Sequence, residues 1–209
     1  MLSSPTDAPA VAVSVFGDRL ELATRYAEWL RGAGVERGLL GPREGERVWE
    51  RHILNSVVVA QLVPADATVV DLGSGAGLPG IPLSLARPDV RLTLLEPLLR
   101  RATFLEEVVA DLGLPIEVVR ARAEDVSLSA QVVVARAVAP LDRLSKWAKR
   151  LLAADGVLLA LKGESAASEL AEHQKALSSL RASATLQVLG DPHGQETNVV
   201  VVRFDEGLA

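Results

Sequence analysis

The residues with the clearest chemical meaning in this sequence form a glycine-rich turn after a short apolar run. The run Thr68–Asp71 leads through Leu72 into Gly73-Ser-Gly75-Ala-Gly77. Glycine lets the backbone turn sharply and approach a ligand without a Cβ in the way, and the helix expected next offers unpaired N–H groups. The spacing predicts a cofactor site of the nucleotide-binding kind. Alone it does not choose the cofactor, because residues 75–80 also fit the Gly-x-Gly-x-x-Gly pattern of dinucleotide-binding proteins.

Two carboxylates near the turn favour a positively charged cofactor. Asp71 lies two residues before the first glycine, where it can accept from an ammonium group, whereas a pyrophosphate would be repelled. Glu96 ends the next apolar run, roughly 20 residues on, where an acidic side chain receives ribose hydroxyls. The combination predicts S-adenosylmethionine. Ala123 and Glu124, after the third run, are expected beside the adenine, although they also fit an ordinary acidic loop that caps the next segment.

These residues need a sheet whose strands end at one edge, and the rest of the chain predicts such a sheet. Apolar runs alternate with helical stretches from residue 68 onward, which is typical of a parallel sheet covered by helices on both faces. Residues 1–64 are expected to form an N-terminal helical extension, and residues 65–209 the α/β core. The predicted strands are Thr68–Asp71, Val90–Glu96, Ile116–Arg120, Gln131–Ala135, Gly156–Leu161 and the antiparallel pair Thr185–Leu189 and Asn198–Phe204. The predicted helices are Val15–Leu30 (followed by breaks at Gly32, Gly34, Gly38 and Gly41-Pro42), Gly45–Leu62, Leu78–Arg87, Leu98–Leu112, Pro140–Ala153 and Ser165–Leu180.

Composition narrows the class of protein. Of 209 residues, 49% are hydrophobic and 23% charged, as in a globular domain, and no apolar run is long enough to span a bilayer. The start, Met1–Ala12, lacks a signal-peptide pattern and is expected to be unstructured, so we expect a cytoplasmic protein. Cysteine is absent and the three histidines lack zinc-site spacing, so no metal is expected. The net charge of −5 argues against a general nucleic-acid binder but allows a local basic face.

Several segments together resemble one family. They are Glu50–Ser56 (ERHILNS), Val70–Leu83 (VDLGSGAGLPGIPL), Leu95-Glu96-Pro97 with Arg100-Arg101 and Phe104-Leu105, Ala135–Ala137 (ARA) and Leu161–Gly163 (LKG). From about residue 15 to 204 the chain is similar to the bacterial small-subunit ribosomal RNA guanine-N7 methyltransferases, also called glucose-inhibited division protein B. The extension Gly77–Pro82 and the motif Arg51–Leu54 are the most specific parts. Two departures concern the helical extension: Asn55 replaces a common Asp, and Gly38-Leu39-Leu40 replaces a common Asn-Leu-Thr.

The resemblance implies a class I (Rossmann-like) methyltransferase fold, with a mostly parallel seven-stranded sheet and an N-terminal helical cap. It implies methylation of N7 of a guanine in the 530 loop of 16S ribosomal RNA, at expected position 527, in the small subunit or its assembly precursor. We expect the enzyme to be a monomer. The cofactor contacts that the motifs carry over are Gly73, Leu78, Glu96, Ala123, Glu124 and Arg136, and the turn itself adds Asp71, Gly75 and Gly77.

Guanine N7 has a free lone pair at neutral pH, so methyl transfer to it requires positioning rather than a general base. RNA also requires positive charge. Arg136 and Lys162, each expected at the end of a strand, are therefore predicted to position the target base or the phosphate backbone. Residues 143–150 fit a solvated helix face equally well, and His52 fits a helix-packing histidine. The further residues predicted to contact RNA are Arg51, His52, Arg100, Arg101, Arg143 and Lys146.

Two other interpretations fit parts of the sequence. A nicotinamide-dependent oxidoreductase matches residues 75–80, but Asp71 and the lack of a Tyr-x-x-x-Lys motif disfavour it. A non-enzymatic RNA-binding protein with a vestigial cofactor site is disfavoured by the intact glycines and carboxylates. Among methyltransferases, the missing Asn/Asp-Pro-Pro-aromatic segment disfavours exocyclic amines as targets, and the missing cysteine disfavours carbon 5 of pyrimidines.

Overall fold

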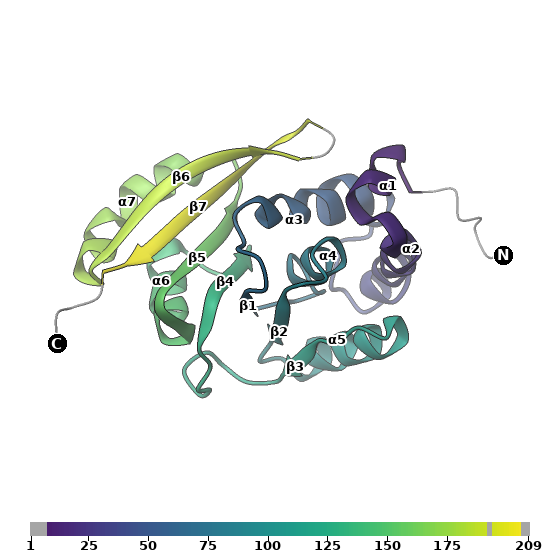
Figure 1. Ribbon diagram of the computed structural model, residues 1–209, viewed down its shortest axis with the longest axis horizontal. Coiled ribbons are helices and arrows are strands. Elements are labelled where there is room, and N and C mark those ends of the chain that lie inside the picture. The colour runs from purple at the N-terminus through teal and green to yellow at the C-terminus, as the bar shows by residue number, and fades with distance from the viewer. Residues whose placement is uncertain (1–7, 192–193, 206–209) are drawn as a thin grey trace.

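A seven-stranded sheet in the order β3-β2-β1-β4-β5-β7-β6 forms the middle layer of the molecule (Figure 1). The computed structural model describes residues 8–191 and 194–205. Strand β7 runs antiparallel to β5 and β6, and the other neighbours pair in parallel, which confirms the predicted fold class. The strands are β1 (Thr68–Leu72), β2 (Arg91–Leu95), β3 (Glu117–Val119), β4 (Ala130–Arg136), β5 (Leu152–Lys162), β6 (Ala182–Gly190) and β7 (Glu196–Phe204).

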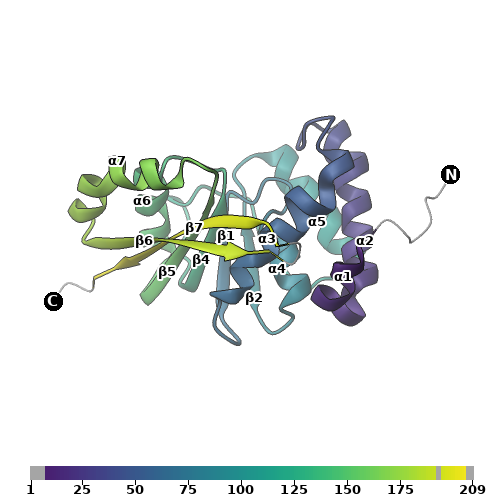
Figure 2. The same cartoon turned by 90° about the horizontal axis from the view of Figure 1, so that it is seen from above.

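Helices cover both faces of this sheet because its central strands alternate between two apolar cores. Val132 and Val134 of β4 face the core that holds α1, α2, α4 and α5, whereas Val133 and Ala135 face the core that holds α6 and α7. Figure 2 shows α6 and α7 at the end of the molecule away from α1 and α2. None of the helices in the described ranges combines the length and apolarity needed to cross a membrane. The α-helices are α1 (Ala10–Phe16), α2 (Leu20–Trp29), α3 (Asn55–Val57), α4 (Gly80–Ala86), α5 (Leu99–Leu112), α6 (Leu141–Leu151) and α7 (Ala166–Ser179).

The N-terminal helices differ from the prediction at both ends. Helix α1 begins at Ala10 and buries Ala12 and Phe16, so the expected unstructured start is wrong from residue 10; residues 1–7 lie outside the described range. Helix α2 (Leu20–Trp29) is not interrupted at Gly32 and Gly34, because it continues through both glycines as a π-helical segment, Leu30–Gly34. A Cβ at Gly34 would lie 3.3 Å from the Trp29 carbonyl oxygen, so this glycine allows close packing rather than a stop. The helix ends instead just before Gly38 (φ +65°), which is one of the predicted breaks.

Other boundaries are set by tertiary partners. The predicted helix over residues 45–62 is a chain of short turns: 3-10 turns at Gly45–Arg47 and Val58–Gln61, a π-helical segment at Val48–Leu54, and α3 between them. Strand β5 starts at Leu152 rather than Gly156, because it already pairs there with Ala130 of β4, before a register shift. Strands β6 and β7 pair over nine positions, from Ala182 with Phe204 to Gly190 with Glu196, and are longer than predicted. The hairpin itself is confirmed.

Candidate active site

The glycine turn leaves β1 at the carboxyl edge of the sheet. Gly73, Gly75 and Gly77 all have positive φ (+71°, +59° and +96°), a backbone region that favours glycine. Packing adds a second constraint at two of them: a Cβ on Gly73 would lie 2.8 Å from a methyl carbon of Val138, and one on Gly77 would overlap the side chain of Ile81. The turn is therefore tightly fitted against the loop after β4 and against α4.

A cavity of about 460 Å³ lies beside this turn, and we call it the cofactor cavity after the predicted cofactor residues in its lining. It joins four of the predicted cofactor residues, Gly73, Glu96, Ala123 and Glu124, which come from the ends of three different strands. The other predicted contacts, Asp71, Gly75, Gly77, Leu78 and Arg136, do not line it, and Leu78 is buried in the apolar core. The full lining is Leu72, Gly73, Leu95, Glu96, Pro97, Leu98, Arg101, Ala121, Arg122, Ala123, Glu124, Ala137, Val138 and Trp147.

The carboxylate of Glu96 is fixed in one orientation at the wall of this cavity. The side chain is 1% exposed; Oε2 accepts from the Gly75 N–H at 3.0 Å and Oε1 from the Leu98 N–H at 2.9 Å. Each oxygen keeps a lone pair that can accept from a hydroxyl. Glu124 is exposed, and its Oε1 accepts from the Trp147 indole N–H at 2.5 Å. Hydrogen bonds from its own backbone N–H and from Trp147 keep the pKa of Glu124 below its usual value. The cavity is therefore lined by two carboxylate acceptors, Glu96 and Glu124.

Asp71 lies in β1, fully buried, with one oxygen satisfied and one not. Oδ2 accepts from the Gly80 N–H at 2.9 Å, whereas Oδ1 has no hydrogen-bond partner among the described residues. Burial is the main reason that the pKa of Asp71 rises to about 7, and the nearby Glu96 raises it further. A buried, unpaired carboxylate oxygen favours a cationic donor, such as the ammonium group of S-adenosylmethionine. A Cβ on Gly80 would lie 2.6 Å from Oδ2, so this last glycine of the dinucleotide-like pattern makes room for Asp71.

Tyr26 of α2 holds the turn from the other side. Its fully buried hydroxyl donates to the Ala76 carbonyl at 2.9 Å, and burial raises the pKa of Tyr26 well above its usual value. The sequence analysis missed this contact. A tyrosine on the apolar face of a helix is a usable signal, because a buried hydroxyl needs a partner, but the sequence does not say which carbonyl provides it.

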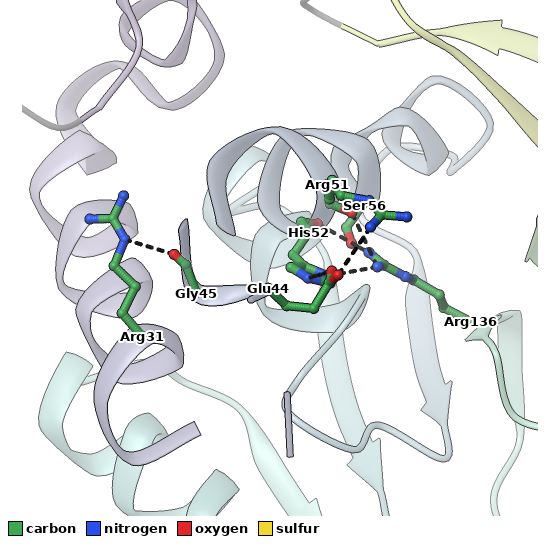
Figure 3. A network of polar contacts seen from close by, with 7 residues as sticks. All are labelled: Arg31, Glu44, Gly45, Arg51, His52, Ser56 and Arg136. Carbon is green, nitrogen blue, oxygen red and sulfur yellow. Dashed lines mark hydrogen bonds and ion pairs between the residues drawn. The ribbon is translucent and has the colours of Figure 1, made fainter. Parts of the chain in front are cut away.

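Arg136, the last residue of β4, points toward Arg51, His52 and Ser56 of the N-terminal helical segment (Figure 3). It does not line the cofactor cavity. Its Nη1 donates to the Ser56 hydroxyl at 3.0 Å and to the His52 carbonyl at 3.3 Å. Its Nη2 donates to the Arg51 carbonyl at 3.1 Å and lies 2.8 Å from His52 Nδ1. Arg136 therefore joins the sheet to the N-terminal helices through four contacts.

His52 connects Arg136 to an acid. Its Nε2 lies 2.8 Å from Glu44 Oε2, while Glu44 Oε1 accepts from Arg51 at 3.0 Å. Burial and the neighbouring Arg136 lower the pKa of His52, so the ring is neutral at pH 7. Because a guanidinium can only donate, Nδ1 must accept and Nε2–H must donate to Glu44. His52 thus fits the alternative considered above, a helix-packing histidine whose ring nitrogens both have partners within the protein, but its partner Glu44 was not anticipated.

Lys162, the last residue of β5, is also paired within the protein. Its Nζ donates to the Ala139 carbonyl at 3.0 Å and to Glu169 Oε1 at 2.7 Å. The same Glu169 oxygen accepts from the N–H of Leu141, the first residue of α6. Lys162 therefore braces the loop between β4 and α6, whose Ala137 and Val138 line the cofactor cavity. Glu169 lies seven residues away across a turn, and no sequence signal marks it.

A second cavity, of about 390 Å³, lies on the far side of that loop and shares Ala137 with the cofactor cavity. It brings together four of the residues predicted for catalysis or RNA binding: Arg51, His52, Arg136 and Lys162. The rest of its lining is Glu44, Asn55, Ala137, Leu161, Gly163, Glu164, Gln195, Glu196, Thr197 and Asn198. Asn55, one of the departures from the family pattern, donates to the Thr197 hydroxyl at 2.6 Å and so ties α3 to β7.

The remaining predicted RNA residues lie outside this second cavity. Arg101 lines the cofactor cavity, with Nη1 3.9 Å from Glu96 Oε2, and Arg100 beside it is exposed. On α6, Arg143 is exposed and Lys146 lies 4.0 Å from Asp142, which is compatible with the solvated face considered above. A further cavity, of about 450 Å³, is at the opposite end of β5 and shares no residue with these two.

The sequence of the chain is similar to those of known proteins of one family. The model of the family described as rRNA small subunit methyltransferase G matches residues 19–195. The ribosomal RNA small subunit methyltransferase G of Mycobacterium marinum is 56% identical over 187 residues, which cover 87% of this chain and 81% of that protein. That of Mycolicibacterium gilvum is 58% identical over 180 residues, covering 84% and 79%.

Solved structures show the same fold in more distant proteins. A SAM-dependent methyltransferase from Aquifex aeolicus superposes with a TM-score of 0.58 at 16% identity, over 83% of this chain and 98% of the other. In the described part of this chain, no group of three or more His, Asp or Glu residues is arranged to hold a metal ion. The family match and the two relatives confirm the predicted resemblance: the chain belongs to the rRNA small subunit methyltransferase G family.

Proposed function

We propose that the protein transfers a methyl group from S-adenosylmethionine to N7 of a guanine in the 530 loop of 16S ribosomal RNA. The observation that carries this proposal is the pair of adjoining cavities, one joining four of the predicted cofactor residues and one lined by polar strand-end residues. Membership of a small-subunit rRNA methyltransferase family supports the RNA class. The base, its N7 atom and the loop rest on the family resemblance of the motifs.

The cofactor cavity supplies contacts for the nucleoside part of S-adenosylmethionine: Glu96 accepts from the ribose hydroxyls, and Ala123 and Glu124 flank the adenine. Asp71 does not line the cavity and contributes a nearby buried carboxylate, whose unpaired Oδ1 favours a cationic group such as the ammonium. These assignments also disfavour a nicotinamide dinucleotide, because Gly80 is needed for Asp71 and not for a pyrophosphate. When bound, the cofactor supplies a methyl group on a positively charged sulfur.

The chemistry at guanine is an in-line displacement. The N7 lone pair forms the new N–C bond, the C–S bond electrons go to sulfur, and no proton moves, so no general base is required. The task of the protein is to hold the base in line and to exclude other orientations. We propose that Arg136 and Lys162 do this by fixing the walls of the second cavity, since their N–H groups already bind protein acceptors.

The substrate particle and setting are also part of the proposal. Arg100 and Arg143 are exposed and are proposed to meet RNA phosphates, with Arg51, Arg101 and Lys146 adding to this positive charge. The acidic net charge favours a localised basic face over general RNA affinity. We further propose that the enzyme acts as a monomer in the cytoplasm, on the small subunit or its assembly precursor.

Transfer of a labelled methyl group to small ribosomal subunits lacking the modification, followed by mapping of the modified nucleotide, tests this function. We expect N7-methylguanine in the 530 loop, at position 527. Label at another base would overturn the proposed target, and no label under saturating cofactor would overturn the activity and favour a protein with a vestigial site. Parallel reactions with Arg136→Ala and Lys162→Ala should be much slower; wild-type rates would remove both from the RNA site.

A further inference from the structure

Two carboxylates in the second cavity are not used by any contact described above. Glu164 follows the end of β5 and Glu196 begins β7, and both side chains are exposed. Neither forms a hydrogen bond or ion pair with another residue in the described ranges. The cavity's other charged groups are paired: Arg136 and Lys162 as described, and Glu44 with His52 and Arg51. The charged groups of this cavity that have no hydrogen-bond or ion-pair partner among the described residues are therefore both carboxylates.

A guanine base matches free acceptors on one edge only. Its N1–H and N2–H groups lie side by side, and the two oxygens of one carboxylate can accept both. The N7 atom lies on a different edge, so a carboxylate on the N1/N2 edge leaves N7 accessible. Adenine has an acceptor at N1, which would repel the same carboxylate. A cavity of about 390 Å³ falls within the usual range for small-ligand sites.

Methylation makes such a contact stronger as the reaction proceeds. When N7 gives its lone pair to the methyl group, the guanine ring gains positive charge, and N1–H and N2–H become better donors. A carboxylate on that edge then binds the transition state more tightly than the unmodified base, which accelerates the reaction. Glu44 cannot take this role without leaving His52 and Arg51, whereas Glu164 and Glu196 have no competing partner.

We infer that the second cavity is the site of the target guanine, and that the carboxylate of Glu164 or Glu196 accepts from its N1–H and N2–H groups while N7 faces the cofactor cavity across Ala137. This inference rests on the proposed function. It assigns the selectivity for guanine to the carboxylate of Glu164 or Glu196. Arg136 and Lys162, at the ends of β4 and β5, hold the walls of the cavity instead.

The test combines two variants, a control and a base analogue. Glu164→Gln and Glu196→Gln are compared with Glu172→Gln, an exposed residue of α7 outside both cavities. Each is assayed on subunits whose 16S RNA carries guanine or inosine at the target position, since inosine lacks the N2 amino group. Losing one hydrogen bond to a charged group predicts a roughly 10- to 100-fold lower kcat/KM for inosine with the wild type and with the control.

In the variant that removes the carboxylate bound to the guanine N1–H and N2–H groups, kcat/KM on guanine should fall by a similar factor. The further decrease of kcat/KM for inosine should then shrink to less than about 3-fold. S-adenosylmethionine affinity should stay at the wild-type value in both variants, which shows that they are folded. If both variants keep the full inosine penalty and wild-type rates on guanine, the inference is overturned while the proposed function stands. If the wild type does not methylate guanine N7, both the inference and the proposed function are overturned.

Discussion

The four contacts of Arg136 predict a large effect from a substitution that keeps its charge. Arg136→Lys replaces a planar fork with a single ammonium nitrogen, which has three N–H groups for four acceptors spread over residues 51, 52 and 56. At least one acceptor loses a charged partner, and each such hydrogen bond contributes about 1.5–3 kcal/mol. We therefore expect the free energy of unfolding to fall by about 2–3 kcal/mol.

Urea denaturation followed by circular dichroism measures this loss. Arg143→Lys is the matched control, because Arg143 is exposed on α6, and it should stay within about 0.5 kcal/mol of the wild type. Thermal melting should agree, since about 1 kcal/mol corresponds to about 2–4 °C in a domain of this size. If Arg136→Lys unfolds like the wild type yet loses methylation, Arg136 acts on the RNA directly and the bracing role described here is wrong.

Three further changes probe the cofactor side. Because the pKa of Asp71 is raised to about 7, the folded protein binds this proton more tightly than the unfolded chain, so stability should decrease as pH rises from about 4 to about 7. Asp71→Asn should flatten that part of the pH profile in urea denaturation; an unchanged slope would contradict the assignment. Gly80→Ala places a Cβ 2.6 Å from Asp71 Oδ2 and should cost about 1–3 kcal/mol by thermal or urea unfolding, whereas Gly32→Ala, with nothing within 4 Å, should be neutral or stabilising. Glu96→Gln keeps one acceptor for two N–H donors and should weaken S-adenosylmethionine binding by about 10-fold in calorimetry, an expectation that wild-type affinity would refute.

The sequence predicted the sheet, the glycine turn and the carboxylate at Glu96 because these depend on local patterns. Alternating strands and helices, φ-positive glycines and an acid at a strand end are each encoded within a few residues. The position of Arg136 at the end of a strand was predicted for the same reason. Its partners were not, since they lie about 80 residues earlier in a segment whose π-helical turns have no sequence signature.

Contacts between residues far apart in the fold account for most of the other differences between the predicted and the observed roles of the site residues. Lys162 was predicted to position the target base or the phosphate backbone, and its ion pair with Glu169 was not predicted, because Glu169 looks like any acid on the solvent-exposed face of a helix. Gly80 fitted a dinucleotide pattern, and only the packed structure shows that it makes room for Asp71. In each case the sequence identified a constrained residue, while the cause of the constraint came from a distant element.

The hydrogen bond from Tyr26 to Ala76 joins residues 50 positions apart, and it ties the opening of α2 to the state of the cofactor turn. Thermodynamic linkage makes such a connection reciprocal. A ligand that orders the turn must slow amide hydrogen exchange in α2, by up to about 2.7 kcal/mol of added protection at a ligand concentration 100 times Kd. Loosening of α2 must in turn weaken the binding of that ligand. The N-terminal helices of this enzyme are thus part of its cofactor affinity, although none of their residues lines the cofactor cavity.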